Sequence, residues 1–325
     1  KTKYAPPAGI PELREALAEK FRRENGLAIT PDQTIVTVGG KQALFNLFQA
    51  ILDPGDEVIV LAPYWVSYPE MVRFAGGVPV EVETLPEEGF VPDPERVKRA
   101  ITARTKALVV NSPNNPTGAV YPREVLEALA RLALEHDFYL VSDEIYEHLI
   151  YEGEHFSPGQ LAPEHTITVN GAAKAFAMTG WRIGYACAPA PILQGLLRVH
   201  QYTVMSAPTI AQDAAVVAIR DEDESVMAMV EEYDRRRRML VPELNRIGLP
   251  TFEPKGAFYA FPKVSVTGLD DETFATRLLQ EEKVAVVPGN SFGAGGEGFC
   301  RISYATAYEK IEEALRRIER FVNRL

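Results

Sequence analysis

The sequence predicts an α/β fold, in which a mainly parallel seven-stranded sheet is covered by helices and followed by a smaller α+β domain. Seven short runs rich in β-branched residues alternate with helical stretches over about the first 190 residues. Several of these runs are almost continuously apolar and do not alternate with polar residues, which is typical of strands buried on both faces of a sheet. Beyond them, one long helical stretch leads into a mixture of short strands and helices. We therefore expect a large domain at residues 1–230 and a small C-terminal domain at residues 231–325.

The individual elements can be placed along the chain. The strands expected in the large domain are residues 34–40, 57–63, 78–85, 106–113, 138–144, 166–171 and 182–188. Helical patterns in the gaps predict helices at residues 10–25, 41–52 and 122–136. In the small domain we expect helices at about residues 222–246, 271–281 and 308–325, and strands at residues 283–289 and 299–305.

Composition and charge exclude several classes of partner. The chain has 325 residues and a net charge of −11, which disfavours binding to nucleic acid or to an anionic membrane surface. Its one basic run, Arg235–Arg238, follows acidic residues at helical spacing and indicates a solvated helix with ion pairs. No apolar stretch reaches the roughly 18–20 residues that span a bilayer. The only two cysteines, Cys187 and Cys300, fit a reducing, cytoplasmic location.

Polar residues collect where the predicted strands end, which is the edge of an open α/β sheet at which ligands bind. The first strand ends in Gly39-Gly40 and leads into a helix whose free N–H groups can receive a phosphate. Taken alone, such a turn is more often structural. The fourth strand ends in a turn where the bond between Asn115 and Pro116 allows a cis peptide. The fifth ends at Asp143, whose carboxylate needs a partner if it is buried.

The sixth strand ends just before Lys174, in the stretch NGAAKAFAMTGWRIGY. The small and apolar neighbours of Lys174 indicate a crowded and largely dry site, and Arg182 follows eight residues later. A phosphate-binding turn, a buried carboxylate, a buried lysine and an arginine therefore meet at one edge of one sheet. This combination matches the chemistry of pyridoxal phosphate: Lys174 would form the Schiff base, Asp143 would keep the pyridine nitrogen protonated, and Arg182 would pair with the phosphate.

Four ordered blocks resemble a known family: SPNNPTG, SDEIYEHL, AAKAFAMTGWRIGY and RISYA. They are similar to those of the class I aminotransferases of pyridoxal phosphate fold type I, and more closely to the thermophile-type subgroup of bacterial aspartate aminotransferases. The resemblance covers the whole chain. It implies the fold type I architecture, pyridoxal 5'-phosphate as the cofactor, amino acids and 2-oxo acids as substrates, and the same roles for Lys174, Asp143 and Arg182.

The resemblance also implies roles for residues that contact the cofactor. Asn115 and Tyr146 look like the pair that binds the phenolic oxygen of the cofactor, and Trp65 looks like the aromatic residue that stacks on its ring. The backbone at residues 40–42, that is Gly40, Lys41 and Gln42, would hold the phosphate. Tyr4 resembles a tyrosine that reaches the phosphate of the neighbouring subunit, which implies a homodimer with shared active sites.

Substrate contacts follow from the same resemblance. Arg301 resembles the arginine that binds the α-carboxylate, a task for which its planar pair of donors is suited. Lys41 resembles the residue that binds the second carboxylate of a dicarboxylic substrate, and Trp65 and Asn115 would also contact the substrate. Without the resemblance, Trp65 would be assigned to the core and Arg301 to an exposed strand. For Lys41, a solvent-facing place in the first turn of its helix stays open as the alternative.

Three departures from the family are visible. Ala172 and Ala173 replace a serine that many relatives carry beside the lysine. The chain begins without Met, at KTKYAPPAG, so we expect that the upstream segment of the family is absent. The segments HQYTVMSAPTIAQ and EPKGAFYAFPKV look more like those of relatives with broad or aromatic specificity than like those of the aspartate group.

The sequence thus predicts an aminotransferase that moves the amino group of aspartate or glutamate to a 2-oxo acid by a ping-pong mechanism, with prephenate as a further candidate substrate. Lys174 must be unprotonated, so we expect burial and Arg182 to lower its pKa from about 10.4. The alternatives are an aromatic, kynurenine-type or broad-specificity aminotransferase, or a C–S lyase that uses the same cofactor. A cofactor-sensing domain of a transcription regulator is disfavoured because the chain lacks a basic helix-turn-helix.

Overall fold

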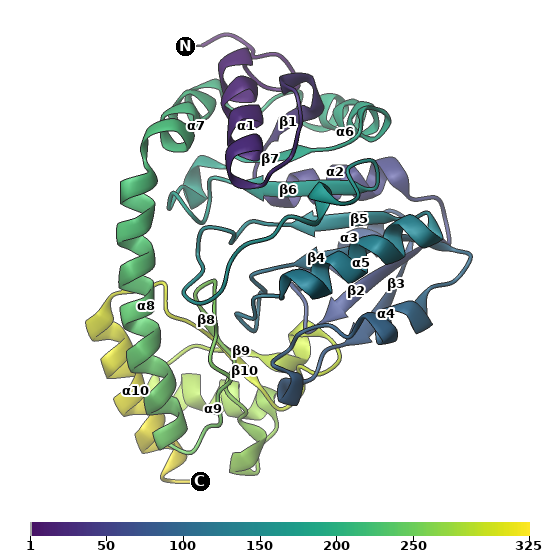
Figure 1. The fold of residues 1–325 in the computed structure, drawn as a ribbon. Coiled ribbons are helices and arrows are strands. Elements are labelled where there is room, and N and C mark those ends of the chain that lie inside the picture. The colour runs from purple at the N-terminus through teal and green to yellow at the C-terminus, as the bar shows by residue number, and fades with distance from the viewer. Residues whose placement is uncertain (1) are drawn as a thin grey trace.

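A seven-stranded sheet forms the centre of the molecule, as shown by the computed structural model, which describes residues 2–325 (Figure 1). Its strands are β1 (Thr34–Thr37), β2 (Glu57–Ala62), β3 (Val78–Glu83), β4 (Thr105–Asn111), β5 (Tyr139–Asp143), β6 (Thr166–Gly171) and β7 (Gly184–Cys187). All seven predicted strands are therefore confirmed. They lie in the order β1-β7-β6-β5-β4-β2-β3.

The sheet is parallel except at β7, which runs antiparallel to both of its neighbours, β1 and β6. Every residue of β2 and β6 is buried, including the polar residues Glu57, Thr166, Thr168 and Asn170. Because β7 is reversed, its first residues lie beside the last residues of β1 and β6. The ends of six strands and the start of β7 thus share one edge.

Helices cover both faces of the sheet, as Figure 1 shows. On one face α2 (Gly40–Ile51), α3 (Ser67–Phe74) and α6 (Ala190–Thr203) pack in one apolar cluster with the strands. On the other face lie α4 (Pro94–Ala100) and α5 (Arg123–His136), and α1 (Pro11–Glu24) and α7 (Thr209–Asp221) pack against β1 and β7. The helices predicted at 10–25, 41–52 and 122–136 are confirmed to within one residue at each end. No helix within residues 2–325 is long and apolar enough to cross a membrane.

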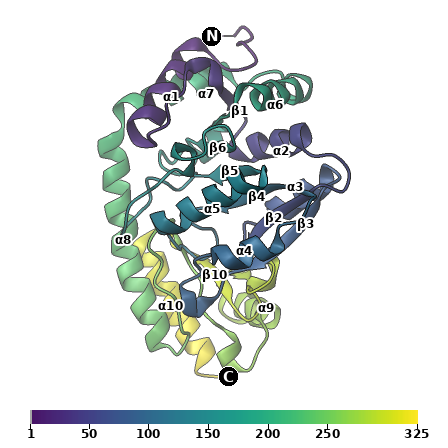
Figure 2. The ribbon, with the colours of Figure 1, turned by 45° about the vertical axis from the view of Figure 1, so that its right-hand side comes forward.

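A long helix, α8 (Asp223–Arg246), leads from α7 along one side of the molecule to a second sheet (Figures 1 and 2). This antiparallel sheet has the order β8 (Tyr259–Ala260), β10 (Cys300–Ser303), β9 (Val287–Pro288). Helices α9 (Asp271–Glu282) and α10 (Tyr308–Val322) pack with α8 in its core. The predicted strands at 283–289 and 299–305 are shorter than expected. The predicted domain boundary at 230/231 falls inside α8.

The basic run on α8 is paired with acidic residues of the same helix, as its spacing predicts. Arg235 and Arg236 donate to Glu232, and Arg238 donates to Asp234. Arg237 differs from the expectation of a solvated face, because it is buried and donates to the carbonyl of Pro254 at 3.0 Å. Arg237 therefore stabilises the packing of α8, whereas its three neighbours form ion pairs along the helix.

Candidate active site

A cavity of about 320 Å³ opens at the edge where the strands end. Its volume lies within the range of small-molecule sites, about 300–1,000 Å³. Nine of the eleven residues predicted for the site line this cavity: Gly40, Lys41, Trp65, Asn115, Asp143, Tyr146, Lys174, Arg182 and Arg301. The other two, Gln42 and Tyr4, do not line it.

The start of α2 and Arg182 form one end of the cavity. Gly39 has φ +82°, and a Cβ atom there would lie 2.5 Å from Nη2 of Arg182, so glycine lets the guanidinium lie against the backbone. Gly39 also provides no side-chain cap, so the only acceptor that it offers to the first turn of α2 is its backbone carbonyl. Arg182 is exposed and donates to the carbonyl of Thr179 at 2.8 Å. A helix N-terminus beside a guanidinium is suited to an anion such as phosphate.

Gln42 is turned away from this end of the cavity. Its backbone N–H donates to the carbonyl of Gly39 at 3.1 Å, and its side-chain oxygen accepts from the N–H of Val38 at 2.7 Å. Of the three predicted phosphate-binding positions, Gly40 and Lys41 therefore line the cavity and Gln42 does not.

Asp143, the last residue of β5, lies at the base of the cavity and is 6% exposed. Burial raises the pKa of its carboxyl group to about 6, although a hydrogen bond from Tyr68 opposes this change. Tyr68 donates to Oδ2 at 2.6 Å, and the N–H of Ile145 donates to Oδ1 at 3.3 Å. The sequence predicts a partner for this carboxylate but does not identify Tyr68, because a tyrosine at such a position resembles a core residue.

Lys174 is half-buried, and its pKa is lowered. Burial is the largest cause, the positive charge of Arg301 comes next, and Arg182 adds to both, whereas Asp143 acts in the opposite direction. The predicted lowering is confirmed, but Arg301 contributes more than Arg182. The second half of the lysine segment is less buried than its composition indicates, since Trp181 is 48% exposed and Arg182 is exposed.

Asn115 and Arg301 both line the cavity and contact each other. Nη1 of Arg301 donates to Oδ1 of Asn115 at 2.9 Å, while Nε of Arg301 is buried without a hydrogen-bond partner. The N–H of Asn115 donates to the side chain of Asn111 at 2.9 Å, and the Asn115–Pro116 peptide bond is cis, as the sequence allows. The free donor on Arg301 indicates that this side of the cavity is ready to accept an anionic ligand.

Aromatic residues form the remaining walls. Trp65 lies at 5.3 Å from Tyr68 in an edge-to-face arrangement, and Nζ of Lys41 is 4.9 Å from the centre of the Trp65 ring. The hydroxyl groups of Tyr146 and Tyr259 are 2.9 Å apart. Tyr259 lines the cavity but was missed, although it lies in the segment GAFYAFP, because the sequence offered no contact for its hydroxyl.

The charges of the cavity differ in sign from those of the whole chain. Four of its lining residues are basic, namely Lys41, Lys174, Arg182 and Arg301, and only Asp143 is acidic. The chain itself carries a net charge of −11. A cluster of this kind attracts anionic ligands into the cavity, and the buried carboxylate at its base is suited to a positively charged group.

Comparison with known proteins identifies the family. The profile described as "Aminotransferase class I and II" matches residues 1–318. The aspartate/prephenate aminotransferase of Thermus thermophilus is 69% identical over 327 residues, which cover 100% of this chain and 84% of the relative. The aromatic-amino-acid aminotransferase 2 of Thermococcus litoralis is 46% identical, with 98% of this chain and 84% of the relative covered.

Solved structures agree with these matches. The structure of Thermus thermophilus aspartate aminotransferase with maleate has a TM-score of 0.95 and 69% identity, and covers 98% of this chain and 84% of its own. The aromatic aminotransferase from Pyrococcus horikoshii has a TM-score of 0.97 and 46% identity, and covers 99% of this chain and 88% of its own. The chain belongs to the class I and II aminotransferase family, and it is an enzyme that depends on pyridoxal phosphate.

Proposed function

We propose that this enzyme transfers the amino group of aspartate or glutamate to a 2-oxo acid in two half-reactions at one site. One observation carries the proposal: a lysine with a lowered pKa, a buried carboxylate and three further cations line the same cavity. The cations suit a phosphate together with substrates that have two carboxylates. The names of the Thermus thermophilus and Pyrococcus abyssi relatives, which include aspartate aminotransferase activity, support the same substrates.

The residues present fit the cofactor. Arg182 and the first turn of α2 would hold its phosphate, since both line the cavity and the guanidinium lies against the turn at Gly39. Asp143 would hold the ring nitrogen, Trp65 would cover the ring, and Asn115 and Tyr146 would bind the phenolic oxygen. When bound, pyridoxal phosphate supplies an electron sink that makes the Cα proton of an amino acid acidic.

Lys174 would move the proton. Its lowered pKa increases the share of neutral amine, which is the form that can accept a proton from Cα of the substrate. The same amine can then return the proton as an ammonium group, and in the second half-reaction it works in reverse. Asp143 must stay ionised throughout, and a positively charged partner would lower its raised pKa.

Arg301 would orient the substrate by its α-carboxylate. Its guanidinium lies 4.6 Å from the ring centre of Tyr259 and 5.0 Å from that of Phe292, so two aromatic faces hold its plane. The buried Nε atom without a partner is a donor that a carboxylate can satisfy. We assign Lys41, at the exposed rim of the cavity, to the second carboxylate of the substrate.

A panel of amino donors tests this function, measured on the parent protein and on Lys41→Met. The variant keeps a long apolar side chain beside Trp65 but removes the charge. We expect the kcat/KM for aspartate and glutamate to fall about tenfold, the lower end of what a charge-assisted hydrogen bond contributes, because Lys41 is exposed. The value for phenylalanine should change less than twofold, so it serves as the internal control. If aspartate and glutamate are not donors for the parent protein, the proposal is wrong.

Aromatic substrates are the second candidate. Trp65, Tyr68, Tyr146 and Tyr259 all line the cavity, and the Thermococcus litoralis relative is named an aromatic-amino-acid aminotransferase. Turnover of phenylalanine or tyrosine without aspartate would favour this candidate. Release of a thiol from a sulfur amino acid without a 2-oxo acid would indicate a C–S lyase instead. Prephenate, named for the Thermus thermophilus relative, belongs in the acceptor panel because it carries two carboxylates.

We propose that the enzyme is a homodimer whose sites are shared. Tyr4 is 85% exposed and lies outside the cavity of its own chain, as expected of a residue that serves the partner's phosphate site. Beside the cavity a second hollow, bordered by Lys41 and Arg182, exposes the apolar side chains of Val66 and Phe74. Exposed apolar surface of this kind is typical of interfaces. The mass in solution should be twice 36.0 kDa, and a monomer would contradict the proposal.

We also propose a cytoplasmic location and retain the division into residues 1–230 and 231–325. Cys187 and Cys300 are both buried and unpaired, as is usual where thiols stay reduced. The second sheet, with α9 and α10, forms an apolar cluster distinct from those of the large sheet, which supports two domains.

A further inference from the structure

A buried polar network lies behind the cavity and connects α1 with the segments that carry Tyr146 and Lys174. Its members are Lys20, Asn25, Glu144, Glu147, His155 and Asn170, and we call them the α1 network. Five of the six are buried and His155 is largely so. None of them is among the residues that line the cavity. Its effect on the site must therefore be indirect.

Glu147 is the centre of this network. It directly follows Tyr146, and its carboxylate accepts hydrogen bonds from Lys20 of α1, from Asn25 at 2.5 Å and from Asn170 at 2.6 Å. Burial alone would raise its pKa, but the charge of Lys20 holds that pKa below its usual range. Glu147 is therefore a charged group that ties α1, the turn after β5 and the end of β6 together.

Asn170 links Glu147 to the backbone that precedes Lys174. Its amide nitrogen donates to Glu147, and its amide oxygen accepts from the N–H of Gly171 at 2.7 Å. Gly171 ends β6, and Lys174 follows three residues later. The orientation of the Asn170 amide thus couples Glu147 to the backbone that leads into Lys174.

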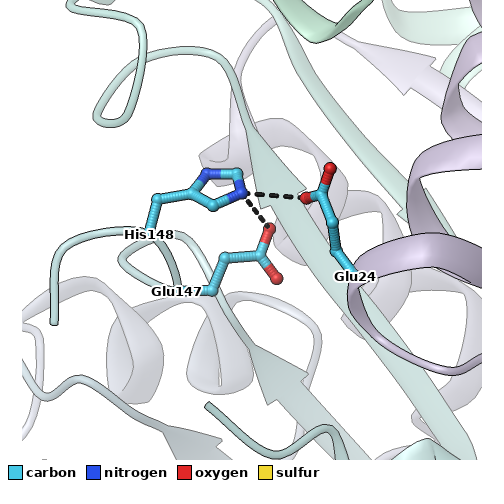
Figure 3. A group of neighbouring side chains, drawn as sticks. All are labelled: Glu24, Glu147 and His148. Carbon is cyan, nitrogen blue, oxygen red and sulfur yellow. Dashed lines mark hydrogen bonds and ion pairs between the residues drawn. The ribbon is translucent and has the colours of Figure 1, made fainter. Parts of the chain in front are cut away.

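A second contact reaches the same segment from beyond Lys174. Figure 3 shows His148 beside Glu147 and Glu24, with Nε2 of His148 at 2.8 Å from Glu24 and 3.9 Å from Glu147. The ring of His148 packs edge-on against Phe176, at 6.1 Å between ring centres. Residues on both sides of Lys174 are therefore held from α1 through the turn that contains Tyr146.

The carboxylates of the network do not call for a metal ion. The ammonium group of Lys20 lies among acceptors on Glu147, on Asn25 at 2.7 Å and on Glu24 at 3.3 Å. Glu144 accepts from Ser142, Ser157, Asn25 and His155. The ammonium group of Lys20 thus takes the place of a metal ion beside these carboxylates. The buried charges are paired, as their low-dielectric surroundings require.

We propose that Glu147 is a positioning residue, which through Lys20 and Asn170 fixes Tyr146 and Lys174 relative to each other. This inference rests on the roles proposed above for those two residues. Without the carboxylate, Asn170 loses its acceptor and Lys20 keeps a buried charge with fewer partners. The segment around Lys174 then gains freedom, and the cofactor is held less well, although no residue that touches it has changed.

Asn170→Ala and Glu147→Gln in the holoenzyme test the proposal. Asn170→Ala removes the link and leaves the ion pair of Glu147 with Lys20 intact, whereas Glu147→Gln keeps the shape and removes the charge. For both we expect hydrogen exchange in residues 171–178 to become about tenfold faster and the dissociation constant for pyridoxal phosphate to rise about tenfold, as for one lost buried hydrogen bond. The kcat for aspartate should fall while its KM stays within twofold, because Arg301 is not in the network.

Glu57→Gln is the matched control. Glu57 is also buried and accepts from Arg104 and Thr102, but it begins β2, at the end of the sheet away from the cavity. The three variants are compared at a similar decrease in the midpoint of thermal unfolding. The proposal is overturned if Asn170→Ala and Glu147→Gln change the hydrogen-exchange rates of residues 171–178 and the affinity for pyridoxal phosphate no more than Glu57→Gln does. Both readouts keep their meaning if aspartate proves not to be a donor, so failure here is distinct from failure of the proposed function.

Discussion

Lys174→Ala is expected to abolish transamination and leave the fold intact. Lys174 is the one amine in the described cavity that combines a lowered pKa with a position at the end of β6, and we assign it both covalent attachment and proton transfer. General acid–base catalysis alone contributes about 10²- to 10⁴-fold, so we expect activity to fall by at least the upper value. Removing a half-buried lysine from a loop should cost little stability.

The measurement is the rate with aspartate and 2-oxoglutarate, together with the visible absorption of the protein with bound cofactor. The band of a cofactor attached to a lysine should be absent in the variant. Lys106→Ala is the matched control: Lys106 is also half-buried, with Nζ 5.8 Å from the ring centre of Tyr139, the same separation as between Lys174 and Tyr146. Turnover by Lys174→Ala within tenfold of the parent protein would show that another group moves the proton.

Asp143→Asn should have the next largest effect. The carboxylate is buried at the base of the cavity, where its negative charge would stabilise a protonated ring nitrogen. Truncating one partner of a buried charge pair costs about 2–5 kcal/mol, so kcat/KM should fall about 30-fold to several thousand-fold. The affinity for pyridoxal phosphate should fall as well, since the amide cannot balance the positive charge on the ring.

Tyr68→Phe separates the charge of Asp143 from its hydrogen bond. The hydroxyl of Tyr68 lowers the pKa of Asp143, so its removal should raise that pKa further and move the acid limb of the pH–rate profile to higher pH. The limiting rate at high pH should change much less than in Asp143→Asn, because the carboxylate is still present and ionised there. Equal losses in both variants at high pH would show that position, and not charge, is what Asp143 supplies.

The fold could be predicted largely because the strands of the central sheet, except the edge strand β3, are mostly buried. In β2, residues 58–62 form an unbroken apolar run, and the polar residues at the ends of β4 and β5 had to lie on one edge once the strands were taken as parallel. The short strands β8 and β9 were harder, since two residues each leave no pattern. Helices α3 and α4 have eight and seven residues and are similarly brief.

The site was predictable where a residue type is unusual in its surroundings, as for Lys174 among alanines. Tyr68 and Tyr259 were not predicted as site residues because their roles come from contacts with residues far away in sequence. Tyr68 contacts Asp143, and Tyr259 contacts Tyr146. The α1 network could not be predicted for the same reason, although Glu147 lies within the block SDEIYEHL. Single sequences indicate which residues are out of place but not which distant residue compensates for them.

The reversed strand β7 has a consequence for how the enzyme is made on the ribosome. β7 is the partner of β1 and lies between β1 and β6, and Arg182 just before it meets the turn at Gly39. The end of the cavity that we assign to the phosphate is therefore complete only after the chain has been synthesised beyond β7, long after α2 has emerged. A nascent chain that stops earlier has β1 without its sheet partner and an open edge on β6, which are surfaces prone to aggregate. With Arg182 assigned to the phosphate, we expect capture of the vitamin-derived cofactor to be a late event in biosynthesis.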